Sequence, residues 1–292
     1  MPLKEEVLIR KPDWLKIKIE NTKEFSFVSK IVSDNGLHTI CSSGKCPNMS
    51  ECWNRGTATF MLLGDVCTRS CKFCATKSGK PLSPDKAEAV KLARSVSMMK
   101  LKHCVLTSVD RDDLSDGGAA HWVECVTEVR KLNPQTTIEV LIPDFDGSHS
   151  LLNMVVQCGA DVFGHNIETV ERITPLVRSR AQFGRSLDVL SFLASKNVVV
   201  KSGLMVGIGE TDEEVIETLK RLHENGCSVV TIGQYLQPTK QHLKVARYVT
   251  PDTFAYYKKE ALEIGFDYVE SAPLVRSSYM AERAVNLNKR HI

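Results

Sequence analysis

Short apolar runs alternate with longer amphipathic segments over most of this chain, and that rhythm restricts the possible folds more than any other feature. Six apolar runs predict strands, at Thr59–Leu63, Cys104–Val109, Ile138–Ile142, Val162–Asn166, Val198–Met205 and Val229–Tyr235. Between them apolar residues recur with helical spacing, as at Val215, Leu219 and Leu222. Six strand–helix units in series favour an α/β fold with a parallel sheet, either open and doubly wound or curled into most of a barrel.

Polar sequences follow the ends of the predicted strands. TSVDRDD follows the second strand, HNIET the fourth, GIGETDEE the fifth and QYLQP the sixth. Parallel α/β folds bind ligands at the carboxyl ends of their strands, so these motifs are expected to converge on one mouth. Thr211 and Glu214 have the spacing of a helix capping box, and Gly207 and Gly209 are expected to let the backbone approach a ligand.

Charge and hydropathy argue against several classes of partner. Lys and Arg exceed Asp and Glu by 38 − 35 = +3, which is too mild to indicate nucleic acid. The apolar run over residues 198–208 is interrupted by Lys201 and glycines, so no membrane span is expected. The first residues mix acids with bases and have no apolar signal region, which predicts a cytoplasmic protein. In the cytoplasm, clustered cysteines indicate metal rather than disulfides.

Six of the ten cysteines fall between residues 41 and 74. They form two triplets: Cys41, Cys46 and Cys52 (C-x4-C-x5-C), and Cys67, Cys71 and Cys74 (C-x3-C-x2-C). Both lie among polar residues and glycines, whereas the other four cysteines lie in or beside apolar runs and are expected in the core. A structural zinc takes four ligands, usually as close pairs. A [4Fe–4S] cluster on three thiolates keeps one iron for another ligand, so two triplets favour two such clusters over zinc.

The second triplet resembles the signature of the radical S-adenosylmethionine superfamily, C-x3-C-x-aromatic-C, with Phe73 as the aromatic residue. The resemblance implies that these three cysteines bind three irons of a [4Fe–4S] cluster and that S-adenosylmethionine chelates the fourth. One electron from the cluster would cleave the sulfonium to methionine and a 5′-deoxyadenosyl radical. Phe73 would lie near the adenine or fill the core.

Six blocks of the chain resemble, in order, those of one family in that superfamily, the lipoyl synthases. They are CPNMSECWNRGTATFMLLGDVCTRSCKFC, TSVDRDDLSDGGAAHW, FGHNIETVERI, GLMVGIGETDEEV, YLQPTKQHLKVARYVTP and SAPLVRSSY, within residues 38–280. The first triplet is the family's particular mark. The segment VRSRAQFGRSL departs from a family block that reads Arg-Pro-Gly-Ala with a later tyrosine, because Ser179, Arg180 and Phe183 stand in those places.

The resemblance implies a chain in three parts. Residues 1–58 form a loop-rich N-terminal extension with the first triplet, residues 59–270 a partial (β/α)6 barrel of the TIM type, and residues 271–292 a C-terminal segment closing over the barrel mouth. In the block Arg276 to Tyr279, Ser278 is implied as the fourth ligand of the first cluster and as a catalytic residue. A serine oxygen is a poorer partner for cluster iron than thiolate, which suits a cluster that must be dismantled.

The other implied cofactor contacts, apart from Phe73, share a place at or after the ends of predicted strands. In this set Asn166 and Glu168 resemble the family's ribose-binding pair, and Thr107 and Ser108 lie where the superfamily holds the methionine end of S-adenosylmethionine. Gln234 and Leu236 end the sixth strand, where backbone groups of the superfamily commonly meet adenine. Arg178 is the remaining member and lies in the departing segment VRSRAQFGRSL.

The family's reaction is implied as well. Sulfur replaces one hydrogen at C6 and one at C8 of an octanoyl group, which is held in amide linkage on a lysine of a lipoyl carrier domain or H protein. Two S-adenosylmethionine molecules are cleaved, and the auxiliary cluster donates the sulfur. An unactivated C–H has no useful acidity, which explains the need for a radical. A low-potential donor such as flavodoxin or ferredoxin would supply electrons. Two alternatives stay open: a biotin-synthase-like enzyme acting on a free small molecule, and a zinc-binding interaction module.

Overall fold

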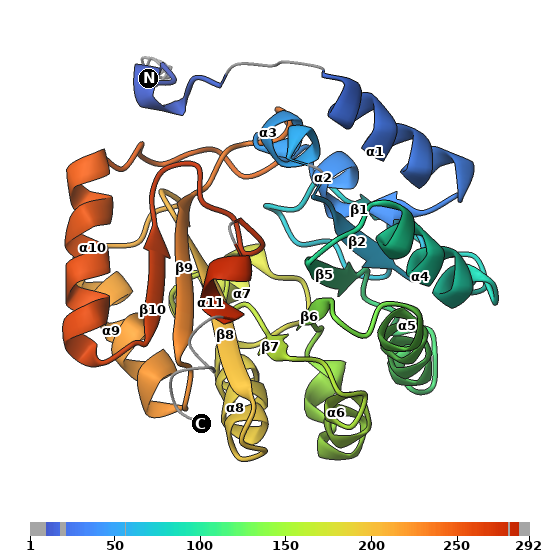
Figure 1. Cartoon of the computed structure of the whole chain (residues 1–292). Coiled ribbons are helices and arrows are strands. Elements are labelled where there is room, and N and C mark those ends of the chain that lie inside the picture. The colour runs from blue at the N-terminus through green and yellow to red at the C-terminus, as the bar shows by residue number, and fades with distance from the viewer. Residues whose placement is uncertain (1–9, 18–21, 56, 280, 286–292) are drawn as a thin grey trace.

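A single curved sheet of eight strands organises the computed structural model, which describes residues 10–17, 22–55, 57–279 and 281–285 (Figure 1). The strands, in their order across the sheet, are β1 (His38–Thr39), β2 (Thr59–Leu62), β5 (His103–Ser108), β6 (Thr137–Leu141), β7 (Val162–Gly164), β8 (Val199–Val206), β9 (Val229–Gln234) and β10 (Tyr268–Ser271). Only β1 runs antiparallel to its neighbour. Within these residues β1 and β10 are the two edges of the sheet, so the barrel is open.

All six predicted strands are present within two residues of their expected ends, and the partial barrel is confirmed. The seventh parallel strand, β10, was not expected. Its four residues alternate only weakly, because Val269 and Ser271 are buried while Tyr268 and Glu270 are half-buried. The backbone of β9 supplies the pairing, from Tyr268 opposite Val229 to the end of the strand. A strand of this length depends on its neighbour more than on its own pattern.

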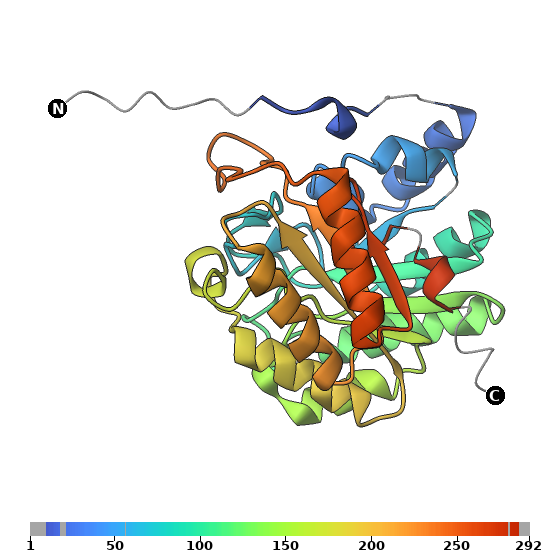
Figure 2. The same ribbon diagram turned by 90° about the vertical axis from the view of Figure 1, so that its left-hand side faces the viewer.

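Helices cover the outer face of the sheet. They are α4 (Glu88–Met98), α5 (Ala119–Leu132), α6 (His149–Val156), α8 (Phe183–Ala194), α9 (Asp212–Glu224) and α10 (Pro251–Ile264). The short helix α7 (Thr174–Val177) lies in the connection between β7 and α8, and its Val177 carbonyl accepts from the Lys72 N–H. Figure 2 shows α9 and α10 side by side on that face. Trp122, Leu190 and Tyr257 are fully buried from three of these helices. None of the described helices is long and apolar enough to cross a bilayer.

The start of α9 confirms the capping box and revises the view of the glycines before it. The Thr211 side chain accepts from the Glu214 N–H, and the Glu214 side chain accepts from the Thr211 N–H. Gly207 has φ +96°, and a Cβ there would clash with Gln234 Nε2 and the Arg247 carbonyl. The close neighbour of Gly207 is therefore the chain itself rather than a ligand.

Residues near α3 in the N-terminal part contact the segment that follows β10, beside the barrel. The N-terminal part contains η1 (Asp13–Leu15), α1 (Lys23–Asp34), α2 (Ile40–Ser43) and α3 (Met49–Asn54), and α1 packs on α3 and α4. A small parallel pair, β3 (Val66–Cys67) and β4 (Lys77–Ser78), follows β2, and η2 (Phe145–Gly147) follows β6. After β10 the chain crosses to α3 and reaches α11 (Glu282–Val285).

Candidate metal and cofactor site

The second triplet lies on a short loop that begins at the end of β3. Two backbone N–H groups donate to the Cys67 sulfur, from Arg69 at 3.4 Å and from Asp110 at 3.3 Å. Burial, with a further contribution from the Asp110 carboxylate, raises the pKa of the Cys67 thiol to about 12. Metal binding would displace that proton. The two N–H donors are placed to stabilise the resulting thiolate, since hydrogen bonds to an ionised acceptor are the stronger kind.

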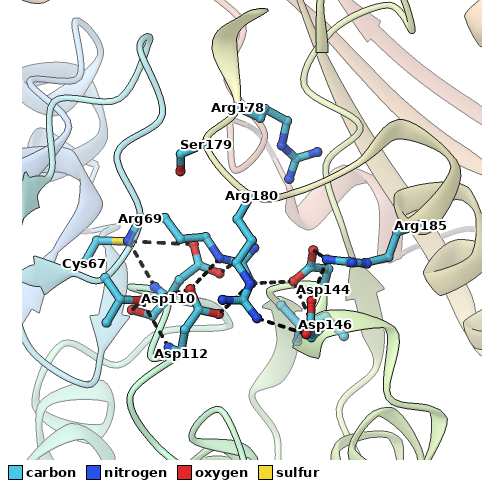
Figure 3. Close-up of polar contacts among 12 residues, drawn as sticks. Cys67, Arg69, Asp110, Asp112, Asp144, Asp146, Arg178, Ser179, Arg180 and Arg185 are labelled. Atoms are coloured by element: carbon cyan, nitrogen blue, oxygen red, sulfur yellow. Dashed lines mark hydrogen bonds and ion pairs between the residues drawn. The ribbon is translucent and has the colours of Figure 1, made fainter. Parts of the chain in front are cut away.

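Arg69, inside this loop, is the centre of an ion-pair network that ties the loop to the sheet (Figure 3). Its guanidinium donates to both carboxylate oxygens of Asp112, at 2.8 and 2.9 Å, and to Asp144 at 2.7 Å, and it lies 3.3 Å from Asp110. Burial would raise the pKa of Asp144, but the Arg69 contacts outweigh it and hold that pKa at about 2. These aspartates follow β5 and β6, so the loop is fixed against the ends of two strands.

The first triplet is assembled by two short helices. Cys41 lies on α2 and Cys52 on α3, and Cys46 lies in the turn between them, where its N–H donates to the Cys41 carbonyl at 3.0 Å. Asn48 in the same turn donates to the Leu274 carbonyl at 2.6 Å. Burial raises the pKa of Cys52 to about 12, and charge on Cys41 and Cys46 acts in the same direction. The charges of the three sulfurs therefore interact.

The C-terminal block packs against this triplet. A cavity of about 330 Å³ has all three cysteines of the first triplet and Ser278 in its lining. Tyr279 donates from its hydroxyl to Glu51 at 3.1 Å, and Arg55 donates to Glu282 at 3.0 Å, so both contacts join the block to α3. The backbone directly before the block also lies close to the sheet, because a Cβ at Gly233 would clash with the Val275 carbonyl.

A second cavity, of about 560 Å³, brings most of the predicted site together. Its lining includes Phe73, Cys74, Thr107, Asn166, Glu168, Gln234 and Leu236, and also Cys41, Cys46, Ser277 and Ser278. Residues from both triplets therefore border one space. Asn166 Nδ2 donates to Ser277 Oγ at 2.7 Å across this lining, a contact that no local pattern predicts.

Five predicted site residues do not line this larger cavity. Cys52 lines the smaller one instead, and Cys67, Cys71, Ser108 and Arg178 line neither. Arg178 Nη1 donates to Ser186 Oγ at 3.1 Å and to the carbonyls of Asn166 and Ile167, both at 3.4 Å, so it braces the backbone of the predicted ribose site. Ser108 Oγ is buried and has no hydrogen-bond partner among the described residues.

The Gln234 side chain is used by the protein itself. Its Nε2 donates to the carbonyls of Val206, Tyr235 and Arg247, and its Oε1 accepts from the Val249 N–H at 2.8 Å. The side chain is therefore saturated, and the N–H of Gln234 donates to the Pro273 carbonyl at 3.3 Å. A contact between this stretch of backbone and adenine stays a prediction.

Glu168 is held in a strained conformation at the cavity wall. Its φ is +67°, a region that non-glycine residues rarely adopt. Backbone bonds on both sides maintain it, from its N–H to the Gly203 carbonyl at 3.0 Å and from the Met205 N–H to its own carbonyl at 2.8 Å. Burial raises the pKa of the Glu168 carboxyl, and Arg178 partly opposes that shift. Strain of this kind persists where the surroundings over-determine it, often at functional sites.

The donor sets fit iron–sulfur clusters. Each triplet offers three thiols within a short stretch of chain, and soft thiolates are the ligands that these clusters take. Among the described residues, potential ligand atoms lie within 4.8 Å of one another in one other place, at Glu88, His121 and Cys125, and in neither triplet. There, however, Glu88 Oε2 already accepts from His121 at 2.5 Å and from the Leu63 N–H at 3.0 Å. That group is a satisfied structural pair beside a core cysteine.

Known proteins with the same motifs decide the family. Residues 61–235 match the model of the Radical SAM superfamily. The lipoyl synthase of Bacteroides fragilis (strain YCH46) is 54% identical over 282 residues, which cover 97% of this chain and 98% of that protein. The chain belongs to the lipoyl synthase family. The lipoyl synthase of Bacteroides thetaiotaomicron is 55% identical to it over 277 residues, 95% of this chain and 98% of that protein.

Solved structures support the fold of this family member. The crystal structure of Streptococcus suis SuiB bound to S-adenosylmethionine superposes with a TM-score of 0.59 at 10% identity, over 78% of this chain and 55% of that chain. At this identity the likeness concerns the radical S-adenosylmethionine fold alone.

Membership of the lipoyl synthase family settles the class of reaction. The enzyme inserts sulfur and uses S-adenosylmethionine and [4Fe–4S] clusters, and its substrate partner is a lipoyl carrier protein. Neither alternative from the sequence, the biotin-synthase-like enzyme or the zinc module, fits relatives that match along nearly the whole chain.

Proposed function

We propose that the enzyme inserts sulfur at C6 and C8 of an octanoyl group on a lysine of a lipoyl carrier domain or H protein, with one cluster at each triplet. The observation that carries this proposal is the 560 Å³ cavity, which borders Cys74 of one triplet and Cys41 and Cys46 of the other. An acyl chain in this cavity would reach both clusters without leaving the protein. Leu141, Leu204 and Met205 also line it, and an apolar wall suits an alkyl chain.

The radical-generating half is proposed at the second triplet. Cys67, Cys71 and Cys74 would bind three irons and leave the fourth for the amino and carboxylate groups of S-adenosylmethionine. The N–H donors on Cys67 and the Arg69 network support this role, because they hold the loop in one shape before any cofactor arrives. Preorganised donors cost no rearrangement at the moment of reaction.

The residues around the larger cavity would bind the rest of S-adenosylmethionine. Asn166 and Glu168 would take the ribose hydroxyls, and Thr107 and Ser108 would face the methionine end. Phe73, Leu236 and the main chain of Gln234 would meet the adenine. Arg178 would not contact the cofactor itself. It would position Asn166 by donating to the Asn166 carbonyl. All of these except Ser108 and Arg178 line the cavity, which is the support for the assignment.

The sulfur-donating half is proposed at the first triplet. Cys41, Cys46 and Cys52 would hold the auxiliary cluster, with Ser278 as a weak fourth ligand and catalytic residue. Ser278 and the three cysteines share the lining of the smaller cavity, and Ser278, Cys41 and Cys46 also line the larger one. Because Ser278 lines both cavities, its oxygen could dissociate from the cluster iron when substrate enters the larger cavity.

The bound cofactors supply the radical and the sulfur atoms, and the chain positions and shields the substrate between them. Electrons would come from a low-potential donor such as flavodoxin or ferredoxin. The cytoplasmic location of the enzyme stays a prediction. The test is an anaerobic assay with reconstituted enzyme, reductant, S-adenosylmethionine and an octanoylated carrier peptide, followed by mass spectrometry. A peptide that gains two sulfurs supports the proposal. Equal turnover of free octanoic acid would contradict it.

A further inference from the structure

Two loops that are distant in sequence hold the backbone of the second triplet's loop. The segment 177–179 binds two of its N–H groups: Ser70 donates to Ser179 Oγ at 3.0 Å, and Lys72 donates to the Val177 carbonyl at 2.8 Å. Ser70 and Lys72 flank Cys71 directly. The proposed chemistry gives Ser179 no role, and the residue is labelled in Figure 3.

The loop after β9 binds two of its carbonyl groups. His242 donates from Nε2 to the Cys74 carbonyl at 2.9 Å, and the Leu243 N–H donates to the Lys72 carbonyl at 3.0 Å. A carbonyl can only accept, so this contact requires the proton on Nε2; in the neutral ring Nδ1 then accepts from the Thr239 hydroxyl, 2.8 Å away. Tyr235, which is 2% exposed, donates from its hydroxyl to the Leu243 carbonyl at 2.7 Å and fixes this loop in turn.

The four peptide groups that these contacts use belong to residues 70 to 74, the stretch that carries two of the three cluster cysteines. Three cysteines on a flexible loop would have to be ordered each time a cluster is bound. Hydrogen bonds that hold the loop in advance remove that entropy cost. The Arg69 network and the Ser179 contact fix the loop before Cys71, and the His242 contact fixes its end at Cys74.

We propose that Ser179 and His242 are positioning residues that clasp the loop of Cys71 and Cys74 and so slow the loss of the cluster bound there. The inference rests on the proposed function, because it assigns the cluster of S-adenosylmethionine to this loop. Neither residue touches the reacting atoms; each acts through a backbone group. Substitution can remove the side chain of Ser179 or of His242 separately. It cannot remove the backbone hydrogen bonds that Val177 and Leu243 make.

The test measures how fast a chelator removes iron, in full-length protein in which Cys41, Cys46 and Cys52 are replaced by Ala so that only the loop's cluster is observed. Ser179→Ala and His242→Leu each remove one contact, and release should be about 2- to 12-fold faster, the range for one net hydrogen bond. Ser179→Thr keeps an acceptor hydroxyl, and His242→Gln keeps an N–H donor near the Nε2 position, so both should release iron close to the parent rate. The same variants with all six cluster cysteines intact should show the same order.

Matched controls remove similar contacts elsewhere. Ser195→Ala loses a surface bond to the Phe192 carbonyl, and His149→Leu loses a surface contact with Asp188, and neither should change iron release. Release at the parent rate from Ser179→Ala and His242→Leu would overturn the clasp alone. Equal acceleration by the Thr and Gln variants would also overturn it, since the hydrogen bonds would then be irrelevant. A parent that holds no iron at this loop would overturn the proposed function and the clasp with it.

Discussion

Asn166 donates from Nδ2 to the hydroxyl of Ser277 at 2.7 Å, although 111 residues separate them in the chain. Asn166 follows β7 and is the predicted ribose contact, while Ser277 precedes the predicted cluster ligand Ser278. The same Nδ2 lies 3.1 Å from Glu168 Oε1. The contact links the predicted ribose site directly to the C-terminal block.

Removing the second triplet separates the two clusters by iron content. Anaerobically reconstituted parent should carry about eight irons, and the Cys67, Cys71, Cys74→Ala variant about four. That variant should make no 5′-deoxyadenosine, because no iron is left to chelate S-adenosylmethionine. The measurement is iron and sulfide analysis with chromatography of the nucleoside. Cys104→Ala, in the core, is the control and should keep the parental iron count; nucleoside formation by the triple variant would rule the assignment out.

Removing the first triplet should leave the radical chemistry and abolish the product. Cys41, Cys46, Cys52→Ala should still cleave S-adenosylmethionine, since the second triplet is intact, but should form no carbon–sulfur bond. Mass spectrometry of the octanoylated peptide and assay of 5′-deoxyadenosine read the two outcomes from one reaction. Any thiolated peptide from this variant would show that the sulfur comes from elsewhere.

Ser278 tests whether weak ligation matters at the auxiliary cluster. Ser278→Cys should keep the iron count near the parent because thiolate is the better ligand for cluster iron. It should still impair sulfur insertion, because a fully thiolate-bound cluster resists losing iron. Ser278→Ala should hold that cluster less tightly. Single-turnover product analysis is the measurement, and parental rate and yield from Ser278→Cys would refute the weak-ligand account.

Gly233→Ala should displace the C-terminal block without touching a proposed ligand. The new Cβ would clash with the Val275 carbonyl, three residues before Ser278, and overpacking of this kind costs about 1–3 kcal/mol. We expect loss of auxiliary-cluster iron and of thiolated product, with S-adenosylmethionine cleavage retained. Gly184→Ala is the matched control, because its Cβ would have no neighbour within 4 Å and it lies in a helix. Equal iron content in both variants would argue against the role of Gly233.

His165 should make the fold sensitive to mild acid. Burial lowers the pKa of His165 to about 4, and its neutral ring is held by the Ile142 carbonyl and the Ser186 hydroxyl, each at 3.0 Å. Because the folded pKa lies below the ordinary value of about 6.5, this stability is present above pH 6.5 and is lost as pH falls toward 4. At pH 5.5 the loss is about 1.4 kcal/mol relative to pH 7.5.

The measurement is urea unfolding of the anaerobic protein at the two pH values, for the parent and for His165→Gln. The substitution removes the titrating group, so the variant should lose less stability between pH 7.5 and 5.5 than the parent does. Parallel losses in the two proteins would show that His165 does not carry the effect.

Local patterns in the sequence determined a large share of this protein. The six apolar runs marked six of the seven parallel strands, and Thr211 with Glu214 marked the start of α9, because burial periodicity and capping act between residues close in the chain. The two cysteine triplets could be recognised in the sequence for the same reason, because the cysteines of each triplet are close together in the chain. The blocks that resemble lipoyl synthases added the family, which the relatives confirm.

Only the tertiary structure decided which loops meet. Arg69 finds its partners 41 to 75 residues away, and Asn166 contacts Ser277, because the sheet brings the ends of distant strands together. The strand β10 exists because β9 offers it a backbone to pair with. The chain's own periodicity encodes which face of an element is buried, whereas these contacts depend on how the elements pack, and a single polar side chain leaves no periodic trace of its partner.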